Sequence, residues 1–220
     1  MRKQKLATMV TCLALVGAVT IGGTLALLTA NSNTVTNTFT VGNGYSSLAL
    51  TLDEAPVSQV TSGASNYGGY AATTDSRVEA NSYTQLVKGT TLAKDPTFHL
   101  AAEQPTSWVV AKITGMNASL PCTGIAADCN WYKIDAAAGT YTKVTAASQI
   151  TDGYYVYGAQ VAAGASTQAL FTQLSVNELP ASSTTPVVVS GVAVEALTSG
   201  GTDLSAAFPA VWAAAQPVLG

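Results

Sequence analysis

The one histidine of the chain, His99, limits the catalytic chemistry that the sequence supports. A zinc peptidase needs two or three histidine or carboxylate ligands and a carboxylate base, as in the H-E-x-x-H motif, and no such spacing surrounds His99. No serine lies in a G-x-S-x-G motif, so a serine nucleophile would have His99 alone as its base. His99 alternates with Phe98 and Leu100, a pattern that predicts a histidine on the solvent face of a strand.

The adjacent carboxylates Asp53 and Glu54 offer no better catalytic pair. Glycosidase chemistry requires two carboxylates that face one substrate. Successive side chains of a strand point to opposite faces, so Asp53 and Glu54 do not converge in this way. We therefore predict a non-enzymatic protein with no catalytic residue, no cofactor and no metal site.

Cys122 and Cys129 lie seven residues apart in the segment 117–130, whose Pro121 and Gly124 indicate a loop. In an exported protein this spacing predicts a disulfide. Two thiols without a nearby histidine do not complete the tetrahedral shell of a zinc ion.

The start of the chain has the pattern of an export signal. Arg2, Lys3 and Lys5 precede an uncharged, largely apolar stretch that extends to Ala30, and no further charged residue occurs before Asp53. We predict a signal peptide over residues 1–26, cut by signal peptidase between Ala26 and Leu27. The mature domain, 27–220, is then expected outside the cell, secreted into an extracellular matrix or held at the cell surface.

This stretch has two other interpretations. It is long enough for an uncleaved membrane anchor, although Gly17, Gly22 and Gly23 weaken it as a stable helix. Lipidation at Cys12 is rejected, because an acylated cysteine should follow the apolar run and Cys12 lies in its middle.

The composition is poor in charge. Charged residues make up 10% of the chain, against about 25% in ordinary soluble domains. There is no basic cluster, and the acidic balance argues against nucleic acid as a partner. A weakly charged surface does little to repel another copy of itself, so the composition favours self-association. An alanine-rich lineage is the alternative explanation.

Short stretches of alternating or β-rich residues predict strands throughout the mature chain. They cover residues 48–52, 97–100, 108–113, 131–134, 140–144, 154–161, 169–176 and 186–196. Residues 131–134 and 140–144 form a predicted hairpin. Without alternating helices, this spacing indicates one antiparallel β-sandwich or barrel. The polar segment Ser62–Asp75 is a predicted loop.

The C-terminal residues have a helical spacing. Apolar side chains recur at Leu204, Phe208, Val211, Trp212 and Ala215, after Thr202 or Asp203 as a candidate cap. Pro209 interrupts the pattern, so we expect two short helical turns that pack Phe208 and Trp212 against the sandwich.

Four stretches together resemble one family of exported proteins. They are Gly22–Ala26 followed by Asn37–Asn43, Val87–Thr97, Tyr154–Phe171, and Val192–Ala196 with Trp212. They are similar to the SipW-type signal-processed TasA/camelysin-like group of Gram-positive bacteria. The resemblance covers most of the mature chain in order. Camelysin-like relatives carry a peptidase label, which the absence of a metal-ligand motif leads us to reject.

The resemblance implies an all-β, antiparallel jelly-roll-like sandwich with a short helical C-terminal segment, exported to form fibres of a biofilm matrix. The resemblance further implies that fibres grow by donation of an N-terminal strand, here within residues 27–42. The matching residues are Thr34, Val35, Thr36, Asn37, Thr38, Phe39, Thr40 and Val41. The equal alternative is that this segment is the first strand of its own domain. Expected partners are other copies of the chain and an accessory anchoring subunit.

A second non-catalytic function is a cell-surface adhesin or carbohydrate-binding module that holds cell-wall polysaccharide. Tyr67 and Tyr70, on the glycine-rich predicted loop, are its candidate ligand residues. Strand aromatics are instead interpreted as core or cross-strand pairs. They are Trp108, Trp131, Tyr132, Tyr154, Tyr155 and Tyr157.

Overall fold

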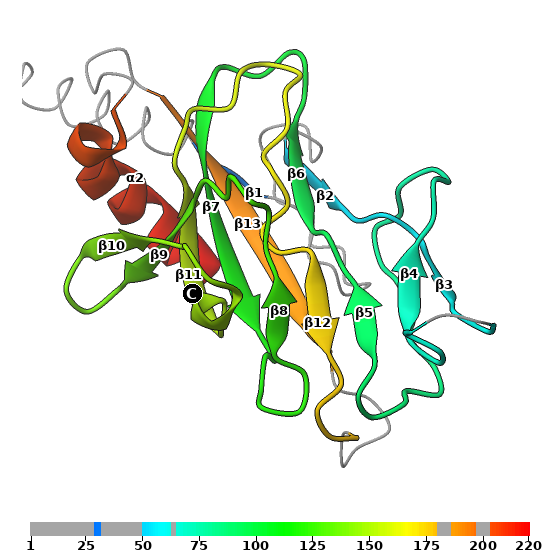
Figure 1. The fold of residues 1–220 in the computed structure, drawn as a ribbon. Coiled ribbons are helices and arrows are strands. Elements are labelled where there is room, and N and C mark those ends of the chain that lie inside the picture. The colour runs from blue at the N-terminus through cyan, green and yellow to red at the C-terminus, as the bar shows by residue number, and fades with distance from the viewer. Residues whose placement is uncertain (1–28, 32–49, 63–64, 180–185, 197–202) are drawn as a thin grey trace, which may run out of the picture.

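A computed structural model describes residues 29–31, 50–62, 65–179, 186–196 and 203–220. These described residues form β-strands and a short 3-10 turn, followed by a C-terminal helix (Figure 1). The predicted signal peptide, its cleavage site at Ala26 and Leu27, and the donor residues Thr34–Val41 all lie outside the described residues. In the part of the chain that is described, no helix is both long and apolar enough to cross a membrane.

The largest sheet has six strands in the order β1-β13-β7-β11-β9-β10. Their bounds are β1 Thr29–Asn31, β7 Ser107–Thr114, β9 Trp131–Asp135, β10 Thr140–Lys143, β11 Gly153–Tyr157 and β13 Val188–Glu195. Every pairing within it is antiparallel. The predicted hairpin is confirmed by β9 and β10.

A second layer contains a five-stranded sheet, in the order β3-β4-β5-β12-β8, and the two-stranded sheet β2-β6. The bounds are β2 Leu50–Asp53, β3 Val57–Gln59, β4 Tyr70–Ala72, β5 Thr91–Ala93, β6 Thr97–Leu100, β8 Cys122–Gly124 and β12 Gln173–Ser175. Their pairings are antiparallel except for a parallel contact between β4 and β5. A 3-10 turn, η1, covers Ala147–Gln149.

The six-stranded sheet is covered on both faces, as β7 shows. Val109, Ala111 and Ile113 belong to the core shared with the second layer, whereas Trp108 and Val110 belong to a cluster formed with the C-terminal helix. Because both faces are apolar, β7 reads as a nearly continuous hydrophobic run instead of a strict alternation. The predicted all-β antiparallel sandwich with a helical end is confirmed.

The C-terminal segment corrects one prediction. It forms a single helix, α2 Leu204–Leu219, and Pro209 does not divide it. A proline inside a helix leaves the carbonyl four residues earlier without its donor. Here Pro209 and Ser205 both lie on the exposed face of α2, where water can satisfy that carbonyl, so the helix continues.

Both ends of α2 have polar partners. Asp203 caps the first turn by accepting the N–H of Ser205 at 2.9 Å. Lys112 Nζ, from β7, donates to the carbonyls of Leu219 at 2.7 Å and Gly220 at 2.6 Å. A cation at a helix C-terminus is favoured by the helix dipole, so the polar contact holds α2 in register on the sheet.

Two loop predictions are also corrected. Residues Tyr70–Ala72, within the predicted loop 62–75, form β4, and Cys122–Gly124, within the predicted loop 117–130, form β8. Each strand is three residues long and is held by partners distant in sequence, so neither has a recognisable local alternation.

We expect the packing of α2 to contribute strongly to stability. Trp212 is 7% exposed and meets Tyr154 edge to face at 5.0 Å between ring centroids. Trp212→Ala should lower the free energy of unfolding by about 3–5 kcal/mol, measured by denaturant titration. Gln216→Ala, on the exposed face of the same helix, is the control and should change it by less than about 0.5 kcal/mol. Equal losses in both variants would contradict this role of α2.

Candidate functional site

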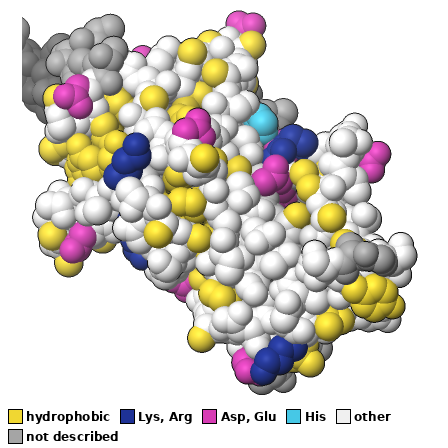
Figure 2. All heavy atoms as spheres, in the orientation of Figure 1, with side chains coloured by type: hydrophobic (Ala, Val, Ile, Leu, Met, Phe, Trp, Pro, Cys, Tyr) yellow, Lys and Arg dark blue, Asp and Glu magenta, His cyan; other side chains and the backbone are white. Residues whose placement is uncertain are grey.

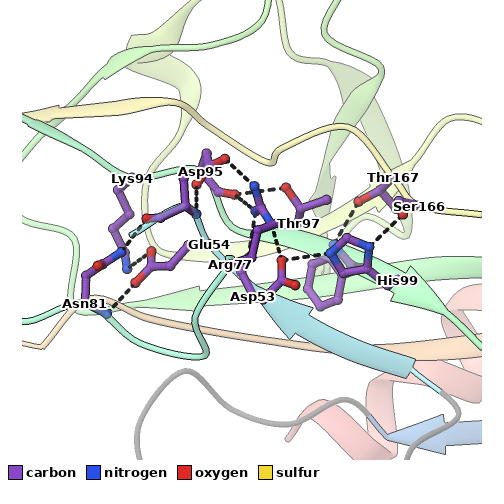
Figure 3. A network of polar contacts seen from close by, with 12 residues as sticks. Asp53, Glu54, Arg77, Asn81, Lys94, Asp95, Thr97, His99, Ser166 and Thr167 are labelled. Carbon is purple, nitrogen blue, oxygen red and sulfur yellow. Dashed lines mark hydrogen bonds and ion pairs between the residues drawn. The ribbon is translucent and has the colours of Figure 1, made fainter. Parts of the chain in front are cut away.

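The described residues bring most of their ion-pairing side chains together where β2, β6 and the link between β5 and β6 meet (Figure 3). Elsewhere on the face shown in Figure 2 charged side chains are few, and Lys88 and Glu178 form a separate ion pair. The cluster has two levels that differ in burial. Asp53 and Asp95 are partly exposed, whereas Glu54 and Lys94, the residues beside them in sequence, are buried. The prediction that Asp53 and Glu54 face opposite ways is confirmed.

We call the exposed level the outer network: Asp53, Arg77, Asp95, His99 and Ser166. Arg77 is its centre. Its Nε donates to Asp53 Oδ1 and its Nη1 to Asp95 Oδ2 at 2.8 Å, while Nη2 reaches the carbonyls of Asp53 at 3.2 Å and Asp95 at 3.0 Å. Partial burial disfavours the charge, but the hydrogen bonds to Asp53 and Asp95 outweigh it and raise the pKa of Arg77 above its ordinary value.

His99 uses both ring nitrogens. Nε2 lies 2.7 Å from Asp53 Oδ1, and Nδ1 lies 2.6 Å from Ser166 Oγ. A carboxylate only accepts, so Nε2 carries the proton and donates to Asp53, and in the neutral ring Nδ1 accepts from the Ser166 hydroxyl. The predicted alternation is confirmed, since Phe98 and Leu100 are buried and His99 is partly exposed. The histidine is nevertheless held by specific partners, which its sequence position did not indicate.

The order Ser166–His99–Asp53 is that of a hydrolase triad, and its surroundings decide how it is interpreted. The same oxygen of Asp53 that contacts His99 also accepts from Arg77. The N–H groups beside Ser166, those of Ala165 and Thr167, donate to Ala162 O and Phe98 O. They are therefore not free to stabilise an oxyanion. We interpret this chain of hydrogen bonds as a clasp between β6 and the segment that contains Ser166.

The buried level is the Glu54–Lys94 pair. Lys94 Nζ lies 2.7 Å from Glu54 Oε2, and the two side chains are 6% and 0% exposed. Glu54 Oε1 accepts the backbone N–H of Asn81 at 2.8 Å. The Asn81 amide is itself fixed, because Nδ2 donates to Ala55 O and Oδ1 accepts from Val57 N.

Tyr83 closes the buried level from the side. Its hydroxyl donates to the carbonyl of Ala93 at 2.7 Å. Burial, and then the negative charges of Glu54 and Asp95, raise its pKa well above the usual range. Tyr83 therefore stays neutral and serves as a hydrogen-bond donor here.

The two tyrosines of the predicted ligand loop do not form one surface. Tyr67 is 65% exposed, but Tyr70 is buried, packs on Tyr83, and exchanges hydrogen bonds with the carbonyl and N–H of Thr84. The prediction of Tyr70 as a ligand residue is therefore wrong, because the formation of β4 turns its ring into the core. Trp108, Trp131 and Tyr155 are also core residues, as predicted.

Cys122 and Cys129 are free, buried thiols in this structure, and the predicted disulfide is not formed. The thiol of Cys122 donates to the carbonyl of Gly124 in its own strand at 3.3 Å. Burial raises the pKa of Cys122 to about 11, and Cys129 adds to the shift. Among the described residues, no three or more His, Cys, Asp or Glu side chains come together in a group that could hold a metal ion.

Comparisons with known proteins do not identify the chain. No family model, no curated protein and no solved structure matches it. The resemblance to the TasA/camelysin-like group therefore stays a prediction.

Sequence reasoning missed Arg77, Lys94, Asp95 and Ser166 as members of the cluster. One signal was present: in a weakly charged chain, Asp53-Glu54 and Lys94-Asp95 are adjacent charged pairs whose signs can complement each other. The partners of Arg77 lie 24 and 18 residues away, so no local pattern pointed to it.

We expect Ser166 not to act as a nucleophile. A fluorophosphonate probe, which labels activated serines, should leave the native protein unlabelled, because the N–H groups of Ala165 and Thr167 are already hydrogen-bonded to other carbonyls. The measurement is intact mass before and after treatment. Labelling that disappears in Ser166→Ala but persists in Ser119→Ala, a control at another serine, would instead establish a reactive serine and contradict the clasp interpretation.

We expect Cys122 of the reduced, folded protein to resist alkylation at neutral pH. A thiol whose folded-state pKa is raised keeps its proton until the pH approaches that value. The stability contributed by the protonated thiol is complete below its ordinary pKa near 9 and is lost as the pH rises through about 11. The reactivity of the Cys122 thiol is measured by iodoacetamide labelling at pH values from 7 to 11, followed by peptide mass spectrometry. Protein unfolded in guanidinium is the control and should react by pH 8–9; equally fast labelling of the native thiol would contradict the prediction.

Proposed function

We propose that this chain is an exported structural subunit that assembles with copies of itself by exchanging its N-terminal strand, and that it carries no enzymatic activity. The observation that supports this best is the position of β1. Thr29–Asn31 lies just after the proposed cleavage site and pairs with Val192–Val194 of β13 at the edge of the six-stranded sheet.

The edge at β13 suits such an exchange. All eight residues of β13 pair with β7 on one side, so the strand is firmly held, while β1 contributes three residues on the other. A short terminal strand that pairs through main-chain bonds is readily replaced by the identical strand of a neighbour. β1 also falls within residues 27–42, the stretch in which the donor strand is proposed.

The surface is consistent with assembly. Charged side chains are few, and several of them are paired with an opposite charge in the outer network and in the Glu54–Lys94 pair. Charge on the surface is the usual means by which sheet proteins avoid edge-to-edge association. A carbohydrate-binding function is the weaker candidate, since Tyr67 is exposed and Tyr70 is buried, so the two rings do not form one binding surface.

The experiment tests which chain supplies the strand next to β13. Thr29 lies directly opposite Val194, so cysteines at these positions are close enough to be oxidised to a disulfide. Thr29→Cys and Val194→Cys are introduced in separate chains with different tags. After the chains are mixed and assembled, with filaments checked by negative-stain microscopy, we expect a disulfide-linked heterodimer on a non-reducing gel.

Val188→Cys is the matched control for register. It lies on β13 six residues from Val194, roughly 20 Å along the strand, and should not form the heterodimer with Thr29→Cys. A third chain carries both Thr29→Cys and Val194→Cys. If filaments form without the heterodimer, or if only this double variant forms a disulfide, within its own chain, then β1 stays in its own domain. Either result would refute strand exchange.

A further inference from the structure

The Glu54–Lys94 pair has a geometry that goes beyond an ion pair. We propose that the two side chains become joined, after folding, by an amide bond between Lys94 Nζ and the carboxyl carbon of Glu54. The bond forms within one chain, so this proposal does not depend on assembly.

The reacting groups are already in place (Figure 3). Lys94 Nζ lies 2.7 Å from Glu54 Oε2, next to the carbon that it must attack. Holding two reactants in contact can supply an effective concentration of about 10⁵–10⁸ M when their orientation is suitable. The Lys94 side chain comes from the residue that follows β5, and Glu54 follows β2, so the fold itself brings the pair together.

The other carboxylate oxygen is also prepared. Glu54 Oε1 accepts the backbone N–H of Asn81 at 2.8 Å, and Asn81 is fixed by the hydrogen bonds of its side chain to Ala55 and Val57. As the amine adds to the carbon, negative charge grows on Oε1. A fixed N–H aimed at that oxygen stabilises the charge where it develops.

Burial supplies the driving force. Glu54 is 0% exposed and the Lys94 side chain 6%, and two full charges are costly in such surroundings. Transfer of a proton from Nζ to Oε2 removes both charges and leaves a neutral amine, the reactive form. The exclusion of bulk water then protects the product from hydrolysis.

The reaction is a simple condensation. The Nζ–Cδ bond forms and the Cδ–Oε2 bond breaks. Two of the three ammonium protons leave with Oε2 as water, and the third stays on the amide nitrogen. Charge is conserved, because an ammonium and a carboxylate become a neutral amide and water, and no oxidant or activating nucleotide is needed.

A second pair in the same chain shows why burial matters. Lys88 Nζ lies 2.6 Å from Glu178 Oε1, but these side chains are 60% and 64% exposed. The functional groups match those of Glu54–Lys94 and the distance is similar, but water can stabilise both of these exposed charges. This pair should remain an ordinary ion pair.

The test is the mass of the purified full-length mature protein, denatured and reduced. We expect a mass lower by one water than the mass calculated from its own sequence, and a branched peptide that joins Glu54 to Lys94 in tandem mass spectrometry. Lys94→Arg, which retains the charge but not the reactive amine, should restore the full mass.

The Lys88–Glu178 pair is the internal control, and its peptides should be found unlinked in the same digest. An unmodified wild-type mass would overturn the proposal, whether or not the variant folds. A loss of ammonia that maps to a bond between Lys94 and Asn81 would also overturn it, since the amine would then have attacked a different carbonyl.

Discussion

The contact on which the second layer depends is the one between Glu54 and Lys94. It connects the end of β2 to the link between β5 and β6, under the outer network and beside the core. Removing one partner of a buried ion pair typically costs about 3–5 kcal/mol, since the other charge is left uncompensated. Around it, Asn81 and Tyr83 satisfy the neighbouring polar groups, and the described buried side chains leave no nitrogen or oxygen without a partner.

The outer network extends this constraint to the surface. Arg77 joins Asp53 to Asp95, and Asp53 in turn orients His99 toward Ser166. The five side chains connect β2 and β6 to three linking segments, those that contain Arg77, Asp95 and Ser166. These contacts matter because β2 and β6 form a sheet of only two strands. The combination of residue types suggests catalysis, but the shared oxygen of Asp53 and the committed N–H groups beside Ser166 favour a mechanical role.

The six-stranded sheet has the opposite character, because it is held by apolar packing on both faces. α2 covers one face through Phe208 and Trp212, and the second layer covers the other. The places where this sheet can accept new main-chain partners are therefore its edges, at β1 and β10. This is the physical basis of the proposed exchange, in which one chain would supply a strand to the next.

Local pattern was enough to predict the longer elements. Phe98, His99 and Leu100 alternate as a half-buried strand must, and the spacing of Leu204, Phe208 and Trp212 predicted helical turns packed on the sheet. Three-residue strands such as β4 and β8, the continuation of α2 through Pro209, and the burial of Tyr70 depend on distant partners or on which face meets water. The same is true of the pairing of Glu54 with Lys94, 40 residues later. The sequence alone determined which residues alternate and where charge is scarce, because these follow from neighbouring side chains; the tertiary structure decided which charges meet, because that requires the chain to close long loops.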